Sequence, residues 1–219
     1  MLQNAKAFLF DLNGTMIDDM HYHKQVWFDI LTKDLGVDLS WEQVASHMYG
    51  KNVELLIRIF GPDKFTPEEM DRLSVEKEKR YQSLYRPHLA LLPGLDIFLD
   101  QAKAKNIKMG IGSAAILFNI DFAIDGLSIR HYFDSIVGAE NVKDSKPDPE
   151  TYLKGAAELG LNPADCIVFE DAPKGVEAAY NAGMKAVVLT TMHTADEFSE
   201  YPNILTYAND YKSLIPLLG

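Results

Sequence analysis

The hydrophobic positions of this chain follow two different periods. Residues 7–10 form a continuous apolar run that stops at a polar cluster, which is typical of a strand buried on both faces of a parallel sheet. After residue 89, short runs of this kind alternate with stretches of helical period. Strands are predicted over residues 107–112, 135–138, 166–169, 185–189 and 204–207, and helices over residues 95–104, 119–127, 149–159 and 174–182. This alternation predicts an α/β fold with a doubly wound parallel sheet.

The stretch between the first strand and residue 89 has a helical period instead. Ser40 with Gln43 has the spacing of a capping box, and Thr66 followed by Pro67 is a strong helix start. We therefore predict that residues 16–88 form an inserted domain of about four short helices. Residues 1–15 and 89–219 then form the α/β core.

Composition and charge restrict the classes of function. The chain has 219 residues, of which 47% are hydrophobic and 24% charged, and it contains neither a run long enough to span a membrane nor a signal-peptide pattern. The single cysteine, Cys166, favours a reducing cytoplasm, and we expect a monomer. A net charge of −11 argues against nucleic-acid binding, and it requires local cations wherever an anionic substrate binds.

Polar residues follow several of the predicted strands. Asp11 follows the first strand, Ser113 the second, and Glu170 and Asp171 the strand over residues 166–169. The carboxyl ends of parallel strands meet at one edge of a sheet, where ligands bind in α/β proteins, so these side chains should converge there with Lys146 from a preceding loop. Three carboxylates at one place need a cation, and Mg²⁺ prefers such oxygen ligands. The alternatives are that Glu170 and Asp171 only cap a helix and that Lys146 lies in solvent.

The order of these residues resembles a known family. Residues 10–15, Phe-Asp-Leu-Asn-Gly-Thr, resemble the D-x-D-G-T signature of the haloacid dehalogenase superfamily. Ser113, Lys146 with Pro147, and residues 170–175 resemble its second, third and fourth motifs in order and separation. Residues 22–27 and 50–52 are similar to the β-phosphoglucomutase branch. The resemblance implies a Rossmann-like core with an inserted all-helical cap over residues 16–88, and phosphoryl transfer with Mg²⁺ on a small phosphorylated metabolite.

The resemblance also implies roles for individual residues. Asp11 would be the nucleophile that forms an aspartyl-phosphate. Mg²⁺ would be bound by the carboxylates of Asp11 and Asp171 and the backbone carbonyl of Asn13, with Glu170 acting directly or through water. Ser113, the N–H group of Ala114 and Lys146 would hold the phosphoryl group. His23, Lys51 and Lys77 of the cap would face the substrate, although His23 is equally explained as a packing residue.

Asn13 departs from the family pattern, because the signature has a second Asp at this position that protonates the leaving group. An amide has no proton to release near neutral pH. We therefore expect a phosphatase with activity attenuated by Asn13. A hexose-phosphate mutase and a weakly catalytic phosphometabolite-binding protein are the alternatives, and the mutase ranks lower because it needs general acid–base catalysis in each half-reaction.

Overall fold

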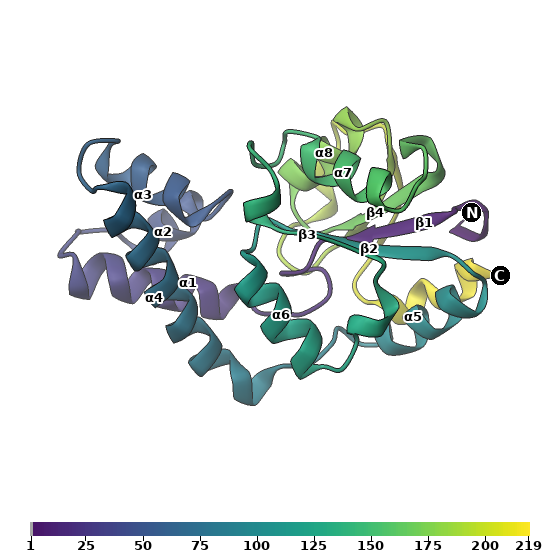
Figure 1. Cartoon of the computed structure of the whole chain (residues 1–219), viewed down its shortest axis with the longest axis horizontal. Coiled ribbons are helices and arrows are strands. Elements are labelled where there is room, and N and C mark those ends of the chain that lie inside the picture. Colours follow the sequence, from purple (N-terminus) through teal and green to yellow (C-terminus); the bar gives the residue numbers. More distant parts are fainter. Residues whose placement is uncertain (1) are drawn as a thin grey trace. The chain divides into compact units, whose positions relative to one another are not determined.

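The structure is a computed structural model that describes residues 2–219. The chain forms two compact units (Figure 1). The first, which we call the α/β unit, contains the chain up to Asp18 and the segment Ala90–Gly219. The second, which we call the helical unit, is the intervening segment Asp19–Leu89. Each unit is described by itself below.

The α/β unit is built on a sheet of six strands, all parallel, in the order β3-β2-β1-β4-β5-β6. The strands are β1 (Ala7–Phe10), β2 (Lys108–Gly112), β3 (Ser135–Val137), β4 (Cys166–Glu170), β5 (Lys185–Leu189) and β6 (Ile204–Ala208). The predicted doubly wound parallel sheet is confirmed, and each strand end lies within about one residue of its predicted position, because each run is stopped by a polar turn.

Helices cover both faces of this sheet. They are α5 (Leu95–Ala104), α6 (Leu117–Gly126), α7 (Glu150–Glu158) and α8 (Pro173–Asn181). Figure 1 shows α7 and α8 on one face and α5 and α6 on the other. Since side chains alternate along a strand, Leu9 of β1 packs in the core with residues of α7 and α8. On the opposite face, the ring of Phe98 of α5 stacks on Phe8 and meets Phe10 edge to face.

The helical unit contains α1 (Met20–Asp29), α2 (Trp41–His47), α3 (Asn52–Phe60) and α4 (Pro67–Tyr85), and α1 continues into a π-helical turn, Ile30–Asp34. The expectation of four short helices is wrong for α4, which has 19 residues. It begins at the predicted helix start, where Thr66 and Glu69 form a capping box, and no Pro or Gly interrupts it before Pro87. Among the described residues, no helix is both long enough and apolar enough to cross a membrane.

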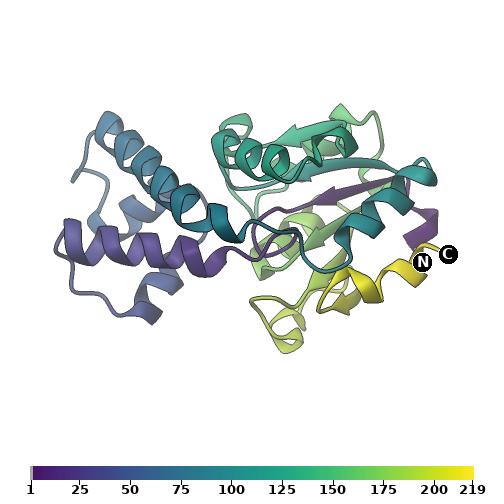
Figure 2. The ribbon, with the colours of Figure 1, turned by 90° about the horizontal axis from the view of Figure 1, so that it is seen from below.

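The strand order places the first strand of the chain in the middle of the sheet. β1 pairs with β2 on one side and with β4 on the other, so the order of the strands changes direction at the boundary between β1 and β4. In open α/β sheets the crevice at the carboxyl ends of such strands is where ligands bind. At the opposite edge, Figure 2 shows the short turns Leu2–Asn4 and Ile215–Leu218 beside each other.

Candidate active site

Three buried carboxylates meet where β1 and β4 end. Phe10 of β1 pairs with Phe169 of β4, so the next residues, Asp11 and Glu170, lie side by side, and the N–H group of Asp11 donates to the carbonyl of Phe169 at 2.9 Å. One carboxylate oxygen from each of Asp11, Glu170 and Asp171 lies within 4.8 Å of the others. The three residues are at most 7% exposed. The structure thus brings the three predicted carboxylates together.

Lys146 provides a positive charge within this group. Its Nζ donates to Asp11 Oδ1 and to Glu170 Oε1, each at 2.7 Å. Burial alone would lower the pKa of Lys146, but the charges of Asp11 and Glu170 outweigh burial and raise that pKa above its ordinary value. The lysine is therefore protonated near neutral pH. We call Asp11, Lys146, Glu170 and Asp171 the carboxylate–lysine cluster.

The carboxylate–lysine cluster has more negative than positive charge, and Asp171 shows the consequence. Burial raises the pKa of Asp171 well above its usual range, and the negative charges of Glu170 and Asp11 raise it further. Thr15 Oγ1 donates to one oxygen of this carboxyl group at 3.3 Å. A divalent cation with a preference for oxygen ligands would offset the excess charge, so these residues fit Mg²⁺.

Two glycines make room for the carboxylates. Gly14 has φ of +79°, and a Cβ atom on it would overlap the carboxyl group of Asp171. A Cβ atom on Gly175, in the first turn of α8, would overlap the carboxyl group of Glu170. Thr191, from the loop after β5, donates its hydroxyl to the carbonyl of Gly14 at 2.6 Å. The family-like sequence around residues 13–15 and 173–175 therefore serves close packing against the acids as well as turn formation.

Glu170 accepts hydrogen bonds at both of its oxygens. Oε1 accepts from Lys146 Nζ at 2.7 Å and from the hydroxyl of Tyr152 at 2.9 Å. Oε2 accepts from the backbone N–H groups of Asp171 and Ala172, each at 2.9 Å. An ionised carboxylate has about four lone-pair sites, so these four donors fill it. Of the two roles left open for Glu170, this arrangement favours contact with a metal through water.

Ser113 and Ala114 lie at the end of β2, the strand next to β1. The N–H group of Ser113 donates to Val137 at 2.9 Å, and its hydroxyl accepts from the N–H group of Ala115 at 3.1 Å. Ser113 is 1% exposed. These bonds shape the turn between β2 and α6. The contact of Ser113 and Ala114 with a phosphoryl group stays a prediction, as does the use of the Asn13 carbonyl as a ligand.

The three predicted cap residues all belong to the helical unit. His23 Nδ1 lies 2.5 Å from Lys77 Nζ, and His23 Nε2 lies 3.3 Å from Asp19 Oδ2. Both side chains are buried, whereas Lys51 is half-buried and forms the N-cap of α3. Both ring nitrogens of His23 thus contact residues of its own unit, which favours the packing role for this histidine.

Sequence patterns did not indicate the acids that surround His23 and Lys77. Lys77 Nζ donates to both oxygens of Glu78 at 3.0 Å, and Tyr81 donates to Asp19 at 2.5 Å. Burial alone would raise the pKa of Glu78, but Lys77 and His23 hold it below its ordinary value. We call Asp19, His23, Lys77 and Glu78 the helical-unit cluster. Lys77 and Glu78 are adjacent polar residues of the long helix α4, and nothing in the sequence indicated that their side chains are buried.

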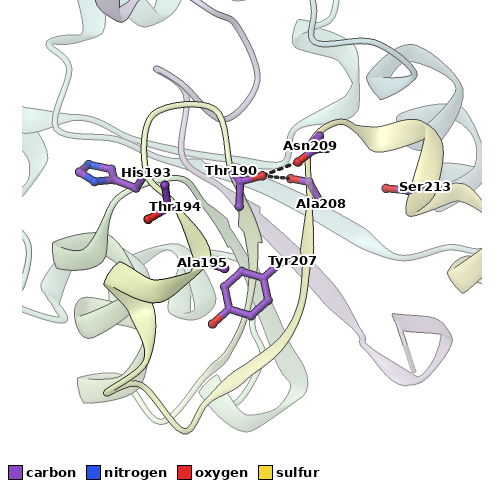
Figure 3. Close-up of a pocket in the computed structure, with 8 residues that line it drawn as sticks. All are labelled: Thr190, His193, Thr194, Ala195, Tyr207, Ala208, Asn209 and Ser213. Atoms are coloured by element: carbon purple, nitrogen blue, oxygen red, sulfur yellow. Dashed lines mark hydrogen bonds between the residues drawn. The ribbon is translucent and has the colours of Figure 1, made fainter.

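A cleft of about 630 Å³ lies beyond the ends of β5 and β6 (Figure 3). Its lining is formed by Thr190, His193, Thr194, Ala195, Tyr207, Ala208, Asn209 and Ser213. Several of its polar groups already have partners nearby, since Thr190 Oγ1 donates to Asn209 and Ser213 donates to Asp210. None of the predicted site residues lines this cleft.

Comparison with known proteins agrees with the geometry. The profile of the family described as "Haloacid dehalogenase-like hydrolase" matches residues 8–189. A β-phosphoglucomutase of Bacillus subtilis is 35% identical over 187 residues, 83% of this chain and 82% of that protein. A fructose-1-phosphate phosphatase of Escherichia coli is 29% identical over 188 residues, 85% of this chain and 97% of that protein. The crystal structure of a β-phosphoglucomutase from Clostridium difficile, 29% identical, matches with a TM-score of 0.82 over 96% of this chain and 93% of that chain.

Proposed function

The chain belongs to the haloacid dehalogenase-like hydrolases, and from this premise we propose that it is a Mg²⁺-dependent phosphatase of a small phosphorylated metabolite. The observation that carries the proposal is the carboxylate–lysine cluster at the carboxyl ends of β1 and β4. Relatives named as a sugar-phosphate phosphatase and a sugar-phosphate mutase support this substrate class.

The reaction would have two steps on Asp11. A carboxylate oxygen attacks the phosphorus atom, the bond between phosphorus and the ester oxygen breaks, and an aspartyl-phosphate forms. Water then attacks this intermediate, releases inorganic phosphate and restores Asp11. Lys146, which donates to Asp11 Oδ1, would hold the carboxylate in place and offset the charge of the phosphoryl oxygens.

The metal requirement follows from the charge balance of the cluster. Asp11, Asp171 and the carbonyl of Asn13 would hold Mg²⁺, and Glu170 would contact it through water. When bound, the ion would neutralise negative charge that develops on the phosphoryl oxygens. Residues of the helical unit, Lys51 above all, would contribute to recognition of the rest of the metabolite.

Asn13 would decide which substrates react. The ester oxygen of a sugar phosphate leaves as an alkoxide and needs a proton, whereas an acyl or aryl phosphate releases a more stable anion. Near Asp11, Lys146 and Tyr152 hold their protons more tightly than usual, since both pKa values are raised, so neither replaces the missing acid. We therefore propose weak activity on sugar phosphates and better relative activity on acyl and aryl phosphates, with the aspartyl-phosphate accumulating.

The test compares phosphate release from sugar, acyl and aryl phosphates by the wild-type protein and by Asn13→Asp. The substitution should raise sugar-phosphate turnover by about 10²-fold or more, the lower range for a positioned acid and base. For acyl phosphates, the rate of the first step, which forms the aspartyl-phosphate, should change much less. Asp11→Ala is the matched control, and it should release no phosphate from any substrate.

Either of two results would contradict this proposal. Phosphate release by Asp11→Ala would exclude the aspartyl-phosphate mechanism. An unchanged substrate profile in Asn13→Asp would mean that another group supplies the proton, and His23→Ala would then identify or exclude His23 as that group.

The relative named as a mutase supports a second candidate, a hexose-phosphate mutase. A mutase must move a proton to and from a sugar hydroxyl in each half-reaction, so the change to Asn13 would impair it more than a phosphatase. Analysis of hexose phosphates by nuclear magnetic resonance separates the two functions, because a mutase forms an isomer without net phosphate release.

A further inference from the structure

Tyr152 lies in the core of the α/β unit and contacts two members of the carboxylate–lysine cluster, Glu170 and Lys146. It lies in the first turn of α7 and is fully buried, with 0% of its surface exposed. Its hydroxyl donates to Glu170 Oε1 at 2.9 Å. Its ring lies next to Lys146, with Nζ at 4.7 Å from the ring centroid. Lys146 donates to the same glutamate oxygen, so one phenol group contacts both partners of this ion pair.

We propose that Tyr152 is a positioning residue for phosphoryl transfer, holding Glu170 and Lys146 in the arrangement in which Lys146 reaches Asp11. This inference rests on the proposed function of the same site. A lysine side chain is a flexible four-carbon stem, and attraction of its ammonium group by an aromatic face limits the positions that it occupies. The hydroxyl fixes the other partner, because it occupies a lone pair of Glu170 Oε1 beside the one used by Lys146.

Packing alone does not account for a tyrosine at this position. The ring lies in the core with Leu9 and Val168, where phenylalanine would fill nearly the same volume. Burying a hydroxyl group is unfavourable unless it is hydrogen-bonded, and this one is bonded to a charged carboxylate rather than to solvent. β2 packs closely against the Tyr152 ring, because a Cβ atom added to Gly112 would lie only 3.1 Å from two carbon atoms of that ring.

Loss of the Tyr152 hydroxyl should strengthen the binding of a metal ion but slow turnover. Glu170 Oε1 would keep only Lys146 as a donor, so the negative potential of the cluster would rise and a cation would bind more tightly. Lys146 would be held less firmly toward Asp11, so phosphoryl transfer would be slower. General loosening of the core would instead weaken metal binding and slow turnover together.

The experiment uses Tyr152→Phe, with Tyr180→Phe as a matched control, because Tyr180 is 51% exposed on α8. Mg²⁺ alone is titrated into each protein by calorimetry, and kcat and KM are measured with the best substrate found. For Tyr152→Phe the Kd for Mg²⁺ should fall roughly two- to fivefold, as expected for one more acceptor site in a buried anionic cluster. The kcat should fall about tenfold with KM within about twofold, the pattern of an interaction made mainly in the transition state. Tyr180→Phe should change none of these values.

An unchanged kcat in Tyr152→Phe, or an affinity for Mg²⁺ that is unchanged or weaker, overturns the inference. The titration does not depend on catalysis. If the wild-type protein releases no phosphate from any substrate, the proposed function fails, and the change in Kd alone then decides whether Tyr152 holds Glu170.

Discussion

The two units of this protein each bury a cluster of acidic and basic side chains, and the two clusters differ in how many basic residues accompany the acids. In the α/β unit, three carboxylates share one ammonium group, that of Lys146. In the helical unit, the carboxylates of Asp19 and Glu78 lie against Lys77 and His23. The pKa of Asp171 in the first cluster is raised by burial and by its acidic neighbours, whereas that of Glu78 in the second is lowered by Lys77 and His23 despite burial.

The comparison separates buried acids that each lie against a basic residue, which is the sense in which we call the helical-unit cluster balanced, from buried acids that outnumber their basic neighbours. A balanced pair satisfies itself through hydrogen bonds and fixes the packing of helices. A cluster with excess negative charge is unfavourable until a cation binds, so its stability and function both depend on that cation. Buried acids therefore indicate a metal site only when the neighbouring bases are too few.

The largest effect on the free energy of unfolding is expected from removing a basic residue of the helical-unit cluster. Lys77→Met should lower the free energy of unfolding by about 3–5 kcal/mol, because it removes the ammonium group that donates to both oxygens of Glu78 and leaves this carboxylate buried. Lys79→Met is the matched control, since Lys79 is exposed on the same helix, and it should cost little. Chemical denaturation with and without Mg²⁺ measures the effect, which should be the same in both conditions. A loss that Mg²⁺ reverses would show that Lys77 belongs to the metal-dependent site.

Neutralising an acid of the carboxylate–lysine cluster should change the free energy of unfolding in the opposite direction. Without metal, Asp171→Asn should raise the free energy of unfolding by on the order of 1 kcal/mol, since each pKa unit of unfavourable shift corresponds to about 1.4 kcal/mol. Stabilisation by Mg²⁺, about 2.7 kcal/mol at a hundred times Kd in the wild type, should disappear. Thermal unfolding in EDTA and in Mg²⁺ measures both changes, with Asp144→Asn in an exposed loop as control. If Asp171→Asn destabilises the metal-free protein, the carboxylates are not in mutual repulsion.

The two clusters should also differ in how their contributions to the free energy of unfolding depend on pH, and this effect is smaller. Because the pKa of Asp171 is raised, the metal-free folded protein binds more protons than the unfolded chain above the ordinary aspartate value of 3.8. The contribution of Asp171 to the free energy of unfolding therefore falls as pH rises toward its raised pKa, by up to about 1.4 kcal/mol per pH unit. Glu78, with a lowered pKa, contributes stability above its unfolded pKa that is lost as pH falls through its folded pKa.

Denaturation of metal-free wild type and Asp171→Asn between about pH 5 and 8 isolates the first of these contributions. The stability gain from the substitution should grow with pH, and so should stabilisation of the wild type by Mg²⁺. A gain that is independent of pH in this range would mean that Asp171 titrates normally.

The sequence predicted the α/β unit well because the relevant signals are local. Short runs rich in apolar residues located the six strands of the sheet within about one residue. Parallel topology then places Asp11 and Glu170 at one edge, and the register of Phe10 with Phe169 explains why they are neighbours. The length of α4 was missed because its middle is polar and shows little amphipathic contrast.

What could not be predicted depends on side-chain burial and on contacts between distant residues. Tyr152 in a helix of mixed polarity looks like an ordinary core residue, and only the fold brings its hydroxyl to Glu170. Likewise, Lys77 and Glu78 are adjacent in a highly charged helix, where exposed side chains are the usual outcome. Their burial against α1 follows from packing in the helical unit.

The central position of β1 also has a consequence for synthesis on the ribosome. β1 pairs with β4, whose residues are made more than a hundred positions later, whereas the helical unit is built from contacts that are short in sequence. At about 5–20 residues per second, β1 waits on the order of ten seconds before β4 exists to pair with it. Once β2 has been made it can pair with one side of Ala7–Phe10, but the side that pairs with β4 stays open, so a nascent chain that stalls before residue 166 should be held by a chaperone or aggregate through this edge.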